Sequence, residues 1–207
     1  LVSVPADASG NPAPGTFPVI LTQTAYRIDT GQLLGSVFQS GNTLLVGGQD
    51  KFMNKRGYIS VAVDVVGSGM SSGEAQLLGT AEQQGYADAV DWVTKQPWFN
   101  GQLGLAGTSY LGITALQTAK QQHPAVKAVF AQVPMGDAYR GTVGAGGLLN
   151  AQFISLWLPL TQSLSVSNKN AAKNNPDFAD LINAANAQHI AAIDRDDRCE
   201  VLGTRKS

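Results

Sequence analysis

The sequence predicts an α/β fold built on a mostly parallel sheet, because apolar runs of strand length alternate with segments of helical periodicity. Four apolar runs have this length, at residues 17–22, 58–66, 102–107 and 126–133. Two helical patterns separate them, from Thr80 to the residue before Pro97 and from Leu111 to Gln122. Alternation of this kind implies right-handed crossovers between parallel strands.

The composition of each run supports its assignment. "FPVILT" is continuously apolar, and "YISVAVDVV" is rich in β-branched residues, as expected of strands buried on both faces. Thr80 with Gln83 three residues later forms a capping-box pattern at the start of the first helix. Apolar residues then recur at helical spacing and predict an inward face, namely Tyr86, Ala89, Val90 and Val93.

The alternation stops at Asp137, and this change predicts the domain organisation. We expect residues 1–136 to form an incomplete sheet core and residues 137–193 to form a helical cap without strands. Residues 194–207 are a charged segment, which we expect to be non-native and to come from a shifted reading frame or an added sequence. At the other end, Leu1 to Val4 alternate like the end of a strand that began earlier.

Composition excludes several classes of function. The 207 residues carry a formal net charge of −1, which gives no basic field for nucleic acid. The longest apolar stretches are shorter than the ~20 residues of a membrane span. One cysteine and two histidines argue against a structural zinc site, and no motif implies a cofactor or a catalytic metal. The single cysteine does not indicate which cellular compartment the protein occupies.

The segment "GLAGTSYLG" at residues 104–112 carries the strongest functional signal. A strand, then Gly-x-Ser with small neighbours, then a helix is the pattern of the nucleophile elbow of α/β hydrolases. Gly107 stands two residues before Ser109, but Leu111 stands where the general pattern has a second small residue. The alternative is an ordinary strand-to-helix turn with Ser109 as the helix N-cap.

Two further segments are candidate ligand sites. "GSGMSSG" at residues 67–73 lacks the third glycine of a dinucleotide-binding loop, so a plain turn explains it better. Tyr26 follows the first apolar run, at the sheet edge where open parallel sheets bind ligands. The same placement also suits a packing tyrosine with a hydrated hydroxyl group.

Neither histidine is placed to activate Ser109. His123 follows the helix that leads away from the serine, about 20 Å distant at 1.5 Å per residue. His189 lies in the second helix of the expected cap, where we interpret it as a surface residue. In this fold the acid and the histidine follow the serine in the chain, so both are expected after the cap.

Several segments together resemble the Xaa-Pro dipeptidyl-peptidase-like hydrolases, and most closely the cocaine-esterase-like branch of acyl hydrolases. They run in order from about Phe17 to Arg140: "PVILTQTAY", "RGYISVAVDVVGSGMSSGE", "DAVDWVTKQPWFNGQLGLAGTSYLG" and "HPAVKAVFAQVPMGDAYR". This family uses Gly-x-Ser-Tyr-x-Gly as its elbow, which accounts for Leu111 and Gly112. The resemblance implies that Ser109 is the nucleophile, with the Tyr110 backbone N–H and the Tyr26 hydroxyl as oxyanion donors.

The same resemblance implies a missing part, since family members continue with further strands, the triad acid and histidine, and a β-sandwich. We therefore expect a truncated chain that is poorly active or inactive alone. Its substrates would be small acyl esters, amides or short Xaa-Pro-type peptides, and Phe153, Trp157 and Leu158 either line their pocket or only pack the cap. The alternative is a non-catalytic fragment, or a binding or assembly protein on a hydrolase scaffold. The cut sheet predicts self-association through an exposed edge.

Overall fold

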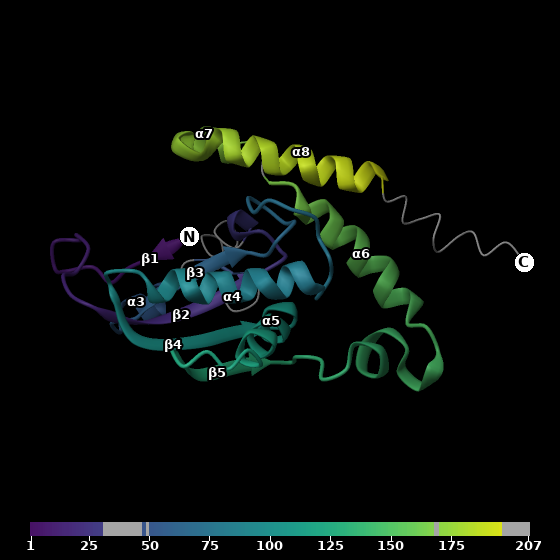
Figure 1. Ribbon diagram of the computed structural model, residues 1–207, viewed down its shortest axis with the longest axis horizontal. Coiled ribbons are helices and arrows are strands. Elements are labelled where there is room, and N and C mark those ends of the chain that lie inside the picture. Colours follow the sequence, from purple (N-terminus) through teal and green to yellow (C-terminus); the bar gives the residue numbers. More distant parts are fainter. Residues whose placement is uncertain (31–46, 49, 168–169, 196–207) are drawn as a thin grey trace, which may run out of the picture.

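One sheet forms the centre of the computed structural model, which describes residues 1–30, 47–48, 50–167 and 170–195 (Figure 1). Within these residues the sheet has five strands in the order β1-β3-β2-β4-β5. Their bounds are β1 Val2–Ser3, β2 Phe17–Thr24, β3 Ile59–Asp64, β4 Phe99–Thr108 and β5 Val126–Gln132. Strands β3, β2, β4 and β5 are parallel, while β1 pairs antiparallel with β3. The predicted α/β class and mostly parallel sheet are confirmed.

The core lies where two helices cover one face of the central strands. Helices α4 (Thr80–Thr94) and α5 (Tyr110–Ala119) contact each other and share one apolar cluster with β2, β3 and β4. The buried members are Val19, Leu21, Ile59, Val61, Val90, Val93, Leu103, Leu105 and Ala115. A short helix, α3 (Lys51–Asn54), precedes β3 and is capped by the Asp50 side chain.

The start of α4 differs from the predicted capping box. The helix begins at Thr80 as predicted, but Gly79 is its N-cap and provides no side chain. Glu82 accepts a hydrogen bond from the Leu78 N–H at 2.7 Å, and the Gln83 side-chain amide donates to the Leu78 carbonyl at 2.8 Å. Two side chains of the first turn thus hold Leu78, in place of the predicted Thr80 cap.

Beyond β5 the described chain contains helices and no strand. They are η1 (Tyr139–Val143), η2 (Ala145–Gly147), α6 (Ala151–Ser165), α7 (Ala171–Asn174), η3 (Pro176–Phe178) and α8 (Ala179–Arg195). Helix α6 lies beyond the carboxyl ends of the strands and runs up toward α8, which lies above α4 in this view (Figure 1). Of the predicted charged segment 194–207, the first two residues complete α8 and residues 196–207 lie outside the described residues. No helix in the described part of the chain is long and apolar enough to span a membrane.

Strand β5 ends the sheet on one side. In the described structure it pairs only with β4, so its outer edge has no strand partner. Its apolar side chains are also open, with Val129 exposed to 39% and Phe130 to 55%. The last strand of this sheet is therefore covered far less than the others.

Candidate active site

Ser109 lies at the turn between β4 and α5, in a backbone conformation rare for serine. Its φ is 58° and its ψ is −122°, in the region that residues with a Cβ seldom adopt. Although it occupies the N-cap position of α5, its side chain makes no capping hydrogen bond. The N-cap alternative therefore does not explain why a serine stands here.

Two glycines allow the strand and the helix to approach at this turn. A Cβ added to Gly107 would lie 2.4 Å from backbone atoms of Leu111. A Cβ on Gly112 would lie 2.9 Å from the Gln132 carbonyl oxygen, at the end of β5. That same carbonyl accepts a hydrogen bond from the Ser109 N–H at 2.9 Å. Close contacts thus explain why both positions, 107 and 112, are glycine. The hydrogen bond to β5 fixes the position of the turn.

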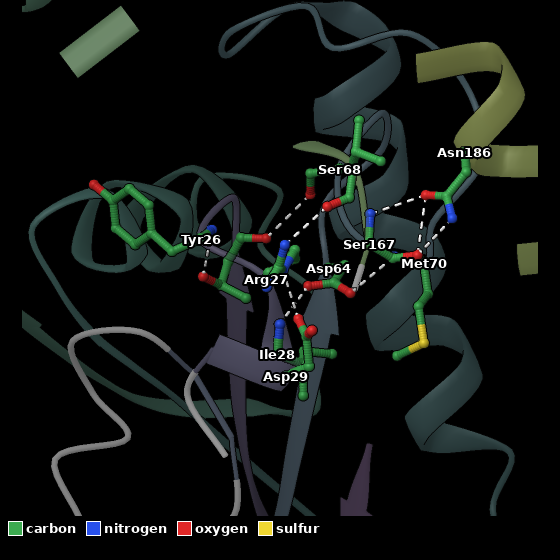
Figure 2. Close-up of polar contacts among 11 residues, drawn as sticks. Tyr26, Arg27, Ile28, Asp29, Asp64, Ser68, Met70, Ser167 and Asn186 are labelled. Carbon is green, nitrogen blue, oxygen red and sulfur yellow. Dashed lines mark hydrogen bonds and ion pairs between the residues drawn. The ribbon is translucent and has the colours of Figure 1, made fainter. Parts of the chain in front are cut away.

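Tyr26 lies beside Tyr110, the residue that follows Ser109 in the chain. Tyr26 follows the end of β2, and its ring centroid lies 5.9 Å from that of Tyr110, the residue after Ser109. The backbone N–H of Tyr110 lies in the first turn of α5, where amides have no acceptor within the helix. Figure 2 shows the Tyr26 ring pointing away from the polar cluster around Asp64.

Helix α6 adds Trp157 to this group. The Trp157 Nε1–H donates a hydrogen bond to the Tyr26 hydroxyl oxygen at 3.2 Å. The Trp157 ring also lies 6.1 Å from the Tyr110 ring and stacks on Phe153 at 6.0 Å. The sequence predicts Trp157 as a pocket wall or a packing residue, and it contains no signal of this hydrogen bond.

A buried carboxyl group holds the Tyr110 side chain. Glu82 is only 2% exposed, and one of its oxygens accepts hydrogen bonds from the hydroxyl groups of both Tyr110 and Tyr86. Burial raises the pKa of Glu82, and the hydrogen bonds from the Tyr86 hydroxyl and the Leu78 N–H offset this only partly. Burial and the neighbouring Glu82 also raise the pKa of Tyr86. Sequence reasoning missed Glu82, although its spacing of four residues from Tyr86 was a usable signal.

A second buried carboxyl group organises the glycine-rich segment 67–73 (Figure 2). Asp64 accepts hydrogen bonds from the backbone N–H groups of Ile28 at 2.8 Å and Met70 at 3.1 Å. Burial raises its pKa to about 6, against the effect of these two hydrogen bonds. A Cβ on Gly69, whose φ is +54°, would lie 2.3 Å from an Asp64 oxygen. The glycine-rich segment therefore wraps an internal carboxyl group, in agreement with the prediction of a plain turn.

Each histidine has a polar partner other than Ser109. His123 follows α5 and lies 3.8 Å from Asp91, as expected for a helix-end residue. The prediction that His189 is a surface residue is wrong, because its side chain is 2% exposed and its Nε2 lies 2.9 Å from the Ser71 carbonyl oxygen. Because a carbonyl only accepts, Nε2 carries the proton, and burial lowers the pKa of the ring.

A cavity of about 270 Å³ lies between α6, α8 and the glycine-rich segment. Tyr110, Trp157, Leu158, Glu82 and His189 are among its lining residues, whereas Ser109 is not. Two of the three predicted wall residues thus face a cavity, and Phe153 instead stacks on Trp157.

Known proteins share this arrangement of sequence and fold. The sequence model of the X-Pro dipeptidyl-peptidase (S15) family matches residues 2–205. A Mycobacterium bovis protein named as a candidate serine esterase is 34% identical over 152 residues, covering 68% of this chain and 23% of that protein. Cocaine esterase of Rhodococcus sp. is 28% identical over 175 residues, covering 84% of this chain and 28% of that enzyme.

Among solved structures, a CocE/NonD family hydrolase of Staphylococcus aureus shares the fold. The TM-score is 0.64 at 24% identity, over 84% of this chain and 34% of that one. The described chain therefore has the α/β-hydrolase fold, and it spans 23% to 28% of the length of the two curated relatives.

Proposed function

This chain belongs to the X-Pro dipeptidyl-peptidase (S15) family, and on that premise we propose that it carries the nucleophile and oxyanion-binding part of a serine hydrolase site. The observation that supports this most is the backbone of Ser109, held at a φ of 58° between β4 and α5. A strained strand-to-helix turn of this kind exposes the serine hydroxyl at the edge of the sheet. The Tyr26 ring, 5.9 Å from the ring of Tyr110, the residue after Ser109, supports Tyr26 and the Tyr110 N–H as the donors in this proposal.

The chemistry is acyl transfer through Ser109. Its hydroxyl oxygen attacks the carbonyl carbon of an ester or amide, and its proton passes to a base. The Tyr110 N–H and the Tyr26 O–H donate to the oxygen that becomes negative, and each such donor typically contributes about 10²–10³ in kcat. The leaving group departs with a proton, and water then hydrolyses the acyl-Ser109 ester.

In this proposal neither histidine of the chain is the base that accepts the Ser109 proton. Since His123 and His189 are both engaged elsewhere, we propose that the histidine and the acid come from outside this chain. Alone, the chain should acylate very slowly, because loss of the base in another serine hydrolase costs about 10⁶ in kcat. In this proposal residues 1–136 supply the sheet core and residues 137–193 the cap.

We propose small acyl esters, amides or short peptides as substrates, without choosing between esterase and peptidase. The second candidate is a non-catalytic binding or assembly protein on the same scaffold. Two observations favour it, namely that neither histidine contacts Ser109 and that β5 has a free edge in the described structure.

A fluorophosphonate probe with added imidazole separates the two candidates. Intact mass would report phosphonylation of the wild-type chain and of Ser109→Ala, with and without imidazole as a substitute base. If Ser109 is a nucleophile without its base, labelling is slow in buffer and increases at least about tenfold with imidazole, only in the wild type. Labelling that stays equal in the two proteins at every imidazole concentration supports the non-catalytic candidate.

A further inference from the structure

Trp157 packs against two aromatic rings and is hydrogen-bonded to Tyr26. Its indole ring stacks on Phe153 with an interplanar angle of 17°, and its other neighbour is Tyr110 at 6.1 Å between centroids. With the ring packed against these two neighbours, its Nε1–H meets the Tyr26 oxygen at 3.2 Å. Because Trp157 belongs to α6 and Tyr26 follows β2, this contact joins the helical segment to the sheet.

The direction of this hydrogen bond follows from the chemistry of the two groups. An indole N–H can only donate, so the Tyr26 hydroxyl oxygen accepts and its own proton stays free for another acceptor. Accepting a hydrogen bond also polarises the O–H group and makes it a stronger donor. A tyrosine arranged in this way is prepared to donate to an oxygen beside Ser109.

We propose that Trp157 is a positioning residue for acyl transfer, which directs the Tyr26 hydroxyl proton toward the substrate oxygen. This rests on the proposed function, in which Tyr26 is an oxyanion donor. Trp157 acts through Tyr26, so its effect exists only while Tyr26 has a hydroxyl group. A role limited to packing would persist when that hydroxyl is removed.

The test uses a nucleophile that needs no base. In the full chain, Ser109→Cys combined with Cys199→Ser leaves one thiol, at position 109. Its thiolate attacks the carbonyl carbon of p-nitrophenyl acetate, forming an acetyl thioester and releasing p-nitrophenolate. Iodoacetamide alkylates the same thiolate without an oxyanion. The ratio of acylation rate to alkylation rate therefore reports the oxyanion donors separately from the reactivity of the thiol.

We expect Tyr26→Phe to lower this ratio by about 10²-fold. We expect Trp157→Phe, which keeps an aromatic ring and loses only the N–H, to lower it roughly three- to tenfold. The two changes together should lower it no further than Tyr26→Phe alone. Trp92→Phe is the matched control, because this tryptophan contacts Trp98 instead of the site and should leave the ratio unchanged.

Other results overturn the inference. If Trp157→Phe leaves the ratio unchanged, or lowers it by the same factor with and without the Tyr26 hydroxyl, Trp157 does not act through Tyr26. If Tyr26→Phe itself leaves the ratio unchanged, the oxyanion role in the proposed function fails as well, which is a distinguishable outcome.

A second measurement applies if the Trp157 variant does not fold. The chain has three tryptophans, so ¹H–¹⁵N spectra should show three indole signals. One of them should move upfield in Tyr26→Phe while the other two stay. If all three signals stay in place, the hydrogen bond is absent and the inference is wrong.

Discussion

At Ser109 the backbone keeps a conformation that a helix N-cap does not need. A residue with a Cβ at positive φ stores strain of order 1–3 kcal/mol, and such strain is concentrated at functional sites. Ser109→Gly removes the strain together with the side chain. Whether this change raises or lowers the free energy of unfolding therefore distinguishes a strained turn from an ordinary N-cap.

We expect Ser109→Gly to raise the free energy of unfolding by about 0.5–1 kcal/mol, measured by urea titration. The gain is smaller than the strain because glycine is more flexible in the unfolded chain. An ordinary N-cap serine would give the opposite sign, a loss of a few tenths of a kcal/mol. Ser109→Ala is the control, since it removes the hydroxyl and keeps the strained backbone.

Asp64 makes stability depend on pH. Its pKa is about 6 in the folded chain and 3.8 in the reference state, so the folded protein binds the extra proton between these values. The stabilisation that this proton gives the folded state is fully present below pH 4 and is lost as pH rises through 6. It amounts to about 3 kcal/mol in total. We expect wild type to lose this amount relative to Asp64→Asn between pH 3.5 and pH 7.5, in denaturant titrations at each pH. A constant difference between the two proteins would show that the Asp64 pKa is not raised.

At the scale of elements, β4 and α5 approach each other closely at Gly107. A Cβ there would meet backbone atoms of Leu111, which cannot move without moving the helix. We expect Gly107→Ala to lower the free energy of unfolding by about 3 kcal/mol, measured by chemical denaturation. Gly136→Ala is the matched control, because nothing lies within 4 Å of its added Cβ. Equal stability of the two variants would mean that the strand and helix do not approach this closely.

The elements that sequence reasoning found are those with local signals. Apolar runs marked β2 to β5, and the glycine and serine spacing marked the turn at Ser109. The burial of His189, the Glu82–Tyr110 contact and the Trp157–Tyr26 contact were not predictable, since each joins segments far apart in the chain. The sequence of a helix does not show whether a polar residue on it faces water or packs against a loop such as 67–73.

At the scale of the whole molecule, β5 leaves apolar surface open. We expect the chain to self-associate through this edge, and Phe130→Lys to shift it toward the monomer, because a charge on an edge strand opposes pairing. Sedimentation velocity over a concentration series measures this. Phe178→Lys is the control, since that side chain is 61% exposed but lies in η3, away from the sheet. A wild-type chain that stays monomeric at every concentration contradicts the prediction.

The strand order also sets a sequence of events during synthesis. Val19 of β2 pairs with Ile59 of β3 and with Leu103 of β4, so the central strand is made long before either neighbour. At roughly 5–20 residues per second, β4 follows β2 from the ribosome by on the order of ten seconds. Until β3 and then β4 have been made, the apolar side chains of β2 have no neighbouring strand to pack beside.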